Sequence, residues 1–396
     1  MSHSPGELLP VPMSSPDLTE AERQAVAEVM ATPRLSMGPR VEAFERAVAD
    51  YVGSKHAVAV NSGTAGLHLC VRAAGVVDAD LVLTTPFSFV ASANVILYER
   101  ATPVFVDVDP QTGNLDPALV EQSVSDLVAG RTAGWLPRRG AERPGPLRAM
   151  IPVDVFGQPA DYDRLLPLAA AHGLRTILDA CESLGAGYRQ RPAGTMGDAG
   201  VYAFYPNKQV TTAEGGLVVT DNDDWAEMVR ALRNQGRAPG DTWLDHTYLG
   251  YNYRLNELNA ALGVAQMGRL EALLAARQQV ADWYGQRLAG VVGVQPPVVA
   301  DTTSRTSWFV YVVQLAPEHD RRQVMAELDR AGVPTRPYFR PIHLQPYFVE
   351  RFGYQPGDFP VAEDLGRRRL ALPFSGVMTE AQVDRVVQAL VAALGG

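Results

Sequence analysis

The chain has 396 residues, of which 46% are apolar, so it can bury a large core and is expected to form two domains. Its formal net charge is -9 and it has no run of lysine and arginine, which argues against a nucleic-acid-binding surface and against binding to an anionic membrane. No stretch is long and apolar enough to span a bilayer, so we expect no membrane partner, and the composition is ordinary for a soluble enzyme.

The cysteines and the N-terminal residues indicate the cellular compartment of the protein. Cys70 and Cys181 lie in apolar or motif-like surroundings and not in a spaced framework, so we predict no disulfide and a reducing, cytoplasmic compartment. Residues 1–16 are polar and rich in proline and serine, which predicts neither a signal peptide nor a membrane anchor.

The first half of the chain alternates strands with helices. Helices are expected at 18–30 and 34–51, and a βαβ rhythm follows. Its expected strands are 57–60, 81–85, 103–108, 150–155 and 176–179, and its expected helices are 67–74, 89–99 and 162–172. This rhythm predicts an α/β fold with a mostly parallel sheet covered by helices.

The second half predicts a smaller domain. Residues 129–146 interrupt the rhythm with glycine, proline and arginine, and form either a surface loop or a functional lid. A strand is expected at 217–220, helical structure from residue 223, and one or two long helices at 255–288. A strand, a helix, a strand and a closing helix follow at 307–315, 321–331, 334–339 and 379–394. We therefore predict a large domain at 1–255 and a small α+β domain at 256–396.

Lys208 is the principal candidate for a catalytic residue. The chain uses arginine at nearly every other cationic position and contains one further lysine, Lys55, yet arginine cannot replace an amine nucleophile. An apolar aromatic run precedes Lys208 and a glycine pair follows it, which predicts a strand that ends in a structured loop. The alternative is an ordinary surface lysine in a turn.

A catalytic lysine amine suggests a pyridoxal cofactor, which needs a phosphate site, an anion at its ring nitrogen and a stacking face. The stretch Ser62-Gly63-Thr64-Ala65 ends a strand and opens a helix, so its amides and the Thr64 hydroxyl could hold a phosphate. Asp179 follows an apolar strand and lies where α/β sheets bind ligands. An ordinary strand-to-helix turn and a capping aspartate are the alternatives.

Three further residues have competing explanations. Glu182 could approach the ring oxygen of the cofactor or end a turn. Phe89 could stack on the ring or belong to the core. For Cys181, a small packed thiol is favoured over a nucleophile, because no histidine lies near it in the sequence. We predict no metal site.

The order of these motifs resembles the DegT or StrS family of sugar aminotransferases, which are fold type I enzymes dependent on pyridoxal 5′-phosphate (PLP). The motifs are Ser-Gly-Thr-Ala, Pro-Phe-Ser-Phe-Val-Ala-Ser, Asp-Ala-Cys-Glu-Ser-Leu-Gly-Ala, Phe-Tyr-Pro-Asn-Lys-Gln and Glu-Gly-Gly. The resemblance implies a large domain with a seven-stranded-type sheet and a small C-terminal domain. It also assigns roles: Lys208 as covalent attachment point and acid/base, Asp179 at the ring nitrogen, Glu182 near the ring hydroxyl, Phe89 as stacking aromatic, and Gly63, Thr64 and Ala65 at the phosphate.

The resemblance further implies a homodimer with shared active sites. Asn252 and Arg254, in Gly-Tyr-Asn-Tyr-Arg, resemble the segment that reaches the partner's phosphate, although a plain loop before the long helix is the alternative. Arg336, Tyr338 and His343 resemble the segment that faces the substrate, where they could meet a diphosphate.

The chain departs from the family pattern at two positions. Ala203 stands where many members carry a phosphate-binding serine, so one hydroxyl of the phosphate site is missing. Glu182 stands where many members carry glutamine. Members with glutamate there include enzymes that aminate C4 of a nucleotide-linked 4-keto-6-deoxy sugar, such as perosamine synthases.

We therefore expect amino transfer from glutamate to a keto group of such a sugar. Amination at C3, or of an inosose, stays open, as does a PLP-binding regulator or catalytically silent partner. A PLP-dependent sugar dehydratase is disfavoured because such members carry histidine in place of Lys208. A nicotinamide oxidoreductase is disfavoured because no strand is followed by a G-x-G-x-x-G turn.

Overall fold

A computed structural model describes residues 10–242 and 244–395, which leaves part of the polar stretch 1–16 outside the described residues. Its largest sheet has seven strands in the order β1-β9-β8-β5-β4-β2-β3. These are β1 (His56–Val60), β2 (Leu81–Thr84), β3 (Thr102–Phe105), β4 (Leu147–Ile151), β5 (Arg175–Asp179), β8 (Ala199–Ala203) and β9 (Gly216–Thr220). Strand β9 is antiparallel to its neighbours β1 and β8, and the other pairs are parallel. The predicted mostly parallel sheet is confirmed.

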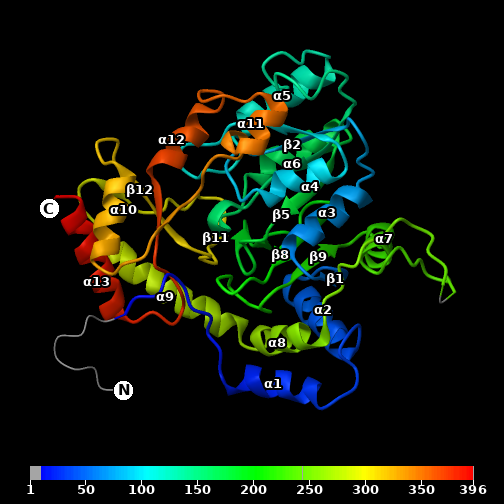
Figure 1. The fold of residues 1–396 in the computed structure, drawn as a ribbon, viewed down its shortest axis with the longest axis horizontal. Coiled ribbons are helices and arrows are strands. Elements are labelled where there is room, and N and C mark those ends of the chain that lie inside the picture. Colours follow the sequence, from blue (N-terminus) through cyan, green and yellow to red (C-terminus); the bar gives the residue numbers. More distant parts are fainter. Residues whose placement is uncertain (1–9, 243, 396) are drawn as a thin grey trace.

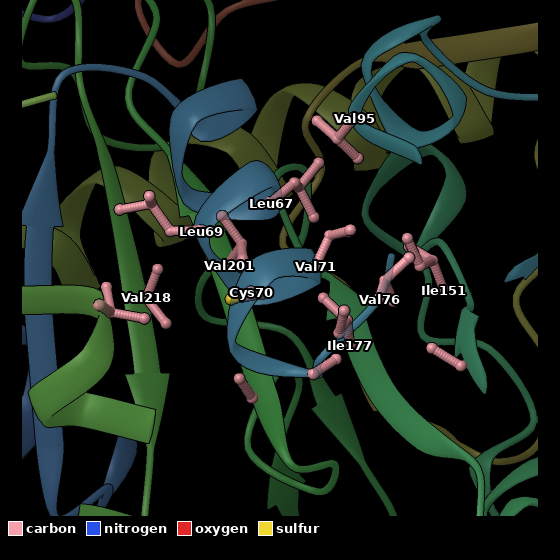
Figure 2. Close-up of a cluster of buried hydrophobic side chains, with 14 of the residues drawn as sticks. Leu67, Leu69, Cys70, Val71, Val76, Val95, Ile151, Ile177, Val201 and Val218 are labelled. Carbon is pink, nitrogen blue, oxygen red and sulfur yellow. The ribbon is translucent and has the colours of Figure 1, made fainter. Parts of the chain in front are cut away.

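Both faces of this sheet are buried, as expected for a parallel sheet covered by helices. In β1, Val58 and Val60 join one apolar cluster and Ala57 and Ala59 join another on the opposite face. The first cluster lies beneath α3 (Gly63–Ala73), where Figure 2 shows Leu67 and Val71 of the helix among side chains of the strands. Helices α4 (Ala91–Tyr98) and α7 (Asp223–Arg233) pack beside α3.

The opposite face carries another set of helices. Helix α2 (Pro39–Val52) places Phe44 and Val48 in the second cluster, and α8 (Glu257–Met267) packs on α2. Helix α1 (Glu20–Met30) lies on α8, while α5 (Pro117–Val128) and α6 (Tyr162–Ala171) contact each other farther along the sheet.

A second sheet lies in the C-terminal part of the chain. Its order is β10-β12-β14-β13, with every pair antiparallel: β10 (Val294–Gln295), β12 (Tyr311–Leu315), β14 (Arg369–Leu372) and β13 (Arg336–Pro337). Helices α9 (Leu270–Leu288), α10 (Arg321–Arg330) and α13 (Glu380–Ala393) bury its apolar side chains in a cluster of their own. In Figure 1, α8 and α9 run along one side of the molecule and link the large sheet to this second one. The domain boundary at residues 255/256 stays a prediction.

The remaining elements are short. A three-stranded sheet joins β11 (Thr303–Arg305), β6 (Gly187–Tyr188) and β7 (Arg191–Pro192). Helices α11 (Pro346–Phe352) and α12 (Pro360–Arg368) precede β14, and single 3-10 turns span Val155–Gly157 and Ile342–Leu344. Among the described residues, no helix combines the length and hydropathy needed to cross a membrane.

Several predicted elements have different bounds. Helix α3 begins at Gly63 and not at residue 67, because the Ser62 side chain caps it by accepting a 3.1 Å hydrogen bond from the Ala65 amide. Of the one or two helices expected at 255–288, the structure has two, α8 and α9, with a break at Gly268 and Arg269. The strand expected at 334–339 is reduced to Arg336–Pro337, and the one at 307–315 begins only at Tyr311.

The segment 129–146 contains no helix or strand. It rests on the C-terminal part of the chain, where Arg138 forms an ion pair with Asp358 and Arg139 donates a 3.0 Å hydrogen bond to the Val349 carbonyl. These contacts attach the segment to α11 and the loop after it.

Candidate active site

A cavity of about 620 Å³ lies at the carboxyl edge of the large sheet and is closed on one side by residues of the C-terminal part of the chain. The sequence-predicted site residues that line it are Gly63, Thr64, Phe89, Asp179, Glu182, Lys208 and Tyr338. They come from five separate segments of the chain, four of which follow or end strands of the large sheet, as expected where a mostly parallel sheet binds its ligand.

The turn from β1 into α3 forms one end of the cavity. The first amides of a helix have no intrahelical acceptor, and the positive end of the helix dipole favours an anion there. A Cβ atom at Gly63 would lie 2.8 Å from the Cβ of Ala203 and 2.9 Å from the Sγ of Cys181, so the backbone approaches β8 and the Asp179 loop more closely than any larger residue permits. Thr64 lines the cavity, whereas Ala65 is buried and does not.

Asp179 ends β5 and is 5% exposed. Its Oδ2 accepts a 2.7 Å hydrogen bond from the Ser92 hydroxyl, and its Oδ1 accepts one of 3.2 Å from the Cys181 amide. The Ser88 hydroxyl lies 3.0 Å from that of Ser92. Ser92 is not among the predicted site residues, although it belongs to the motif Pro-Phe-Ser-Phe-Val-Ala-Ser that carries Phe89.

A second buried carboxylate lies behind Asp179. Asp154 is fully buried, and its carboxylate accepts hydrogen bonds from the Tyr162 and Ser183 hydroxyls and from the Ala160 amide. The pKa of Asp154 is raised to about 6, chiefly by burial and to a lesser extent by the negative charge of Asp179, while its hydrogen bonds act in the opposite direction. The Asp154 amide also donates a 3.0 Å hydrogen bond to the Asp179 carbonyl, so the two acidic residues share one local structure.

Glu182 lies beside Lys208 in the cavity. Its Oε1 lies 3.6 Å from Lys208 Nζ, and its Oε2 accepts a 2.8 Å hydrogen bond from the Phe156 amide. Burial raises the pKa of Glu182, while the positive charge of Lys208 acts in the opposite direction.

Lys208 lies in the connection between β8 and β9, where its amide donates a 2.9 Å hydrogen bond to the Tyr205 carbonyl. Its side chain is 12% exposed. The Nζ atom lies 3.8 Å from the ring centroid of Phe309, a contact of the cation–π type. Phe309 comes from the segment before β12, and no local sequence pattern connects it with Lys208.

The other predicted residues lie outside the cavity. His343 is fully buried, with its Nε2 atom 3.1 Å from Glu363 Oε1, so in this conformation it does not reach a substrate. Arg336 is exposed at β13. Asn252 is exposed next to the β1–α3 turn, where the Asn61 side chain contacts its carbonyl, and Arg254 donates a 3.1 Å hydrogen bond to Asn234 Oδ1.

Sequence comparison identifies the family. The model of the DegT/DnrJ/EryC1/StrS aminotransferase family matches residues 16–391. The chain belongs to this family. It is 39% identical over 384 residues to a GDP-perosamine synthase of Caulobacter vibrioides, covering 96% of this chain and 97% of that one.

Solved structures agree with this assignment. DesV of S. venezuelae is 32% identical with a TM-score of 0.85, and the match covers 97% of this chain and 98% of DesV. The aminotransferase PseC of Helicobacter pylori is 26% identical with a TM-score of 0.87, covering 98% and 100% of the two chains. The predicted fold and family are thereby confirmed.

Aminotransferases of this family depend on PLP, and the cavity has the chemistry to hold it. It combines the primary amine of Lys208, the buried carboxylate of Asp179 and the N-terminus of α3, where Gly63 has no side chain to block a ligand. The predicted cofactor is confirmed at the level of the family. Which side chain contacts which part of PLP stays a prediction.

Proposed function

We propose that the chain transfers the amino group of glutamate to the C4 keto group of a nucleotide-linked 4-keto-6-deoxy sugar. The observation that carries this proposal is the meeting of Lys208, Asp179 and Glu182 in one cavity. The similarity to a GDP-perosamine synthase supports the substrate class, and the glutamate at position 182 supports amination at C4.

The chain's own residues have distinct roles in this proposal. When bound, PLP supplies an aldehyde that takes up an amino group and a ring that holds the electron pair released at an adjacent carbon. The Lys208 amine would hold the cofactor covalently and, once free, would accept and return the proton of the reacting carbon. Asp179 would keep the ring nitrogen protonated through its negative charge, and Glu182 would lie near the ring hydroxyl.

The cofactor phosphate would lie at the first turn of α3, held by the amides of Gly63 to Ala65 and the Thr64 hydroxyl. Phe89 would stack on the ring, and its 62% exposure in the single chain leaves its face accessible. Arg336, Tyr338 and His343 would face the nucleotide sugar. Because His343 is buried here, its contact would require the segment 336–344 to move.

The reaction is tested with the purified protein, PLP, glutamate and a panel of UDP-, GDP- and dTDP-linked keto sugars. Release of 2-oxoglutarate identifies the substrate, and NMR of the product locates the new amine at C4 or C3. We expect a C4 amine. A C3 amine or an aminated inosose would show that the proposed substrate is wrong. If glutamate fails to convert bound PLP into its pyridoxamine form, the proposal of amino transfer from glutamate is wrong.

The role of Lys208 has a matched control in the same chain. Lys55, the other lysine, is an exposed residue paired with Asp223 at 2.7 Å. After borohydride treatment with PLP, wild-type protein and Lys55→Arg should carry covalently bound cofactor, whereas Lys208→Arg should carry none. Retention of label in Lys208→Arg would make the assignment wrong.

We also propose a cytoplasmic homodimer in which Asn252 and Arg254 reach the partner's cofactor phosphate. Free thiols at Cys70 and Cys181 support a reducing compartment, and the exposed aromatic side chains of Phe89 and Tyr205 support a covering partner. Co-expression of Lys208→Ala and Asn252→Ala subunits provides the test. If Asn252 acts across the interface, mixed dimers regain one intact site and activity returns; if it acts within its own subunit, they stay inactive.

A further inference from the structure

Arg277 is a buried arginine beneath the catalytic-lysine candidate. It lies on α9 and is 4% exposed. Its Nη2 donates to the carbonyls of Asn207 and Lys208, at 3.2 Å and 2.6 Å, and its Nη1 donates to those of Trp308 and Phe309, at 3.1 Å and 3.3 Å. Within residues 10–242 and 244–395, no carboxylate lies within ion-pair distance of it.

Burying a charged side chain without a counter-ion destabilises the folded protein, so the presence of Arg277 at this position needs an explanation. Burial lowers the pKa of Arg277 to about 10, which leaves the side chain charged at neutral pH. The planar guanidinium carries several N–H donors in a fixed fork and can bond two separate backbone segments at once. Lysine donates from a single atom and cannot span them in the same way.

The two segments that Arg277 joins are those that meet at the lysine amine. One carries Lys208, and the other carries Phe309, whose ring centroid lies 3.8 Å from Lys208 Nζ. One guanidinium therefore holds the backbone of the amine-bearing residue and the backbone of the ring that lies against that amine.

The backbone is strained at Trp308, the residue before Phe309. Trp308 has a φ of 50°, in the left-handed region that a bulky side chain rarely adopts. Its carbonyl is bound by Arg277, and its indole Nε1 donates a 2.8 Å hydrogen bond to Gln278. Two adjacent residues of α9 thus hold Trp308 in the conformation that directs Phe309 toward the cavity.

We propose that Arg277 is a positioning residue for Lys208, which fixes the amine against the Phe309 ring through the four backbone carbonyls. The consequence for catalysis rests on the role proposed for Lys208. An amine held against a ring face has few rotamers and little contact with water, so it returns to the same place after each displacement. Loss of the four hydrogen bonds from Arg277 should lower kcat by roughly tenfold to a hundredfold. The KM for the sugar should change little, because only the reacting amine is misplaced.

The test uses the shielding of nuclei above an aromatic ring. Reductive methylation with ¹³C-formaldehyde of the full chain, freed of cofactor, labels Lys55, Lys208 and the amino terminus, and Lys55→Arg and Lys208→Arg assign the signals. In wild-type protein the Lys208 methyl signal should lie upfield of that of Lys55. Phe309→Leu should abolish this displacement because the ring is gone.

The decisive variants are Arg277→Met and Arg277→Lys, in which the upfield displacement should be lost and reduced, respectively. Arg321→Lys is the matched control, because Arg321 is also an arginine bonded to two backbone carbonyls, those of Gly366 and Arg369, in the C-terminal part of the chain. It should keep the wild-type displacement. Each lysine variant adds a methylated amine, whose signal is identified by combining that variant with Lys208→Arg. Circular dichroism verifies folding, and if Arg277→Met does not fold, Arg277→Lys decides.

An unchanged Lys208 methyl signal in folded Arg277 variants would overturn the proposal that Arg277 positions Lys208. So would the absence of any upfield displacement in wild-type protein. Neither outcome depends on which substrate the enzyme uses, so the failure of this inference is distinguishable from the failure of the proposed function.

Discussion

The hydroxyl of Ser92 donates a 2.7 Å hydrogen bond to Oδ2 of Asp179. Ser92 belongs to α4 and Asp179 to the end of β5, so the bond connects a helix and a strand that both line the cavity. A carboxylate that is 5% exposed needs such donors, since a buried charge without hydrogen bonds is destabilised. The bond also fixes the direction in which the carboxylate faces.

We therefore expect Ser92→Ala to weaken PLP binding and to lower kcat. A hydrogen bond to a charged group is worth about 1.5–3 kcal/mol, which corresponds to a tenfold to hundredfold effect. Spectroscopic titration with PLP and steady-state kinetics would measure both. Ser88→Ala should have a smaller effect, because Ser88 contacts Ser92 and not the carboxylate; equal effects of the two variants would contradict this explanation.

Gly63→Ala should reduce the affinity for PLP and destabilise the fold. The new Cβ would meet the Cβ of Ala203 at 2.8 Å and the Sγ of Cys181 at 2.9 Å, so α3 would have to shift away from β8. Gly285→Ala is the matched control, because nothing outside the adjacent residues and the backbone of α9 itself lies within 4 Å of its Cβ position. Alanine there should stabilise the helix by up to about 1 kcal/mol. Thermal melts with and without PLP would separate the two effects.

Ala203→Ser should strengthen PLP binding. Ala203 lines the cavity next to Gly63, and a hydroxyl there would supply the phosphate ligand that many family members carry. One additional hydrogen bond of about 1 kcal/mol predicts an affinity about fivefold higher in equilibrium titration. Ala199→Ser, on the same face of β8 but away from the cavity, should leave the affinity unchanged. An unchanged affinity in Ala203→Ser would mean that the phosphate lies elsewhere.

Asp154 should make the fold less stable as the pH rises. Its pKa in the folded protein is about 6, above the ordinary value, so the folded state binds the proton more tightly than the unfolded state. The stabilisation is complete below about pH 4 and is lost as the pH rises through 6, with a total change of about 3 kcal/mol. Urea unfolding of wild-type protein and Asp154→Asn across this range should give a difference that falls by this amount, and a constant difference would refute the assignment.

The alternation of strands and helices was predictable because each apolar run is bounded by turn residues. The residues at the ends of these strands, among them Asp179 and Thr64, could therefore be expected to meet, and the structure brings them to one cavity. Helix α5 received no prediction, although Asp116 caps it at Pro117. Helix α3 begins earlier than the predicted residue 67, because the Ser62 side chain caps it.

The surroundings of Lys208 could not be predicted in the same way. Phe309 and Arg277 lie far from it in the sequence, and their contact with it depends on how α9 and the segment before β12 pack against the large sheet. His343 was expected to face the substrate, yet it is buried against the rings of Tyr354 and Phe359. A polar motif alone does not reveal whether a histidine points to solvent or into an aromatic cluster.

The position of Lys55 has a practical consequence for attaching the protein to surfaces. Lys55 precedes β1, whereas the turn that begins the cavity follows β1, so the two lie at opposite edges of the large sheet, roughly 16 Å apart along the strand. With the cofactor covalently bound at Lys208, amine-reactive supports would find only Lys55 and the amino terminus. Coupling through Lys55 would immobilise the enzyme with its cavity facing the solution.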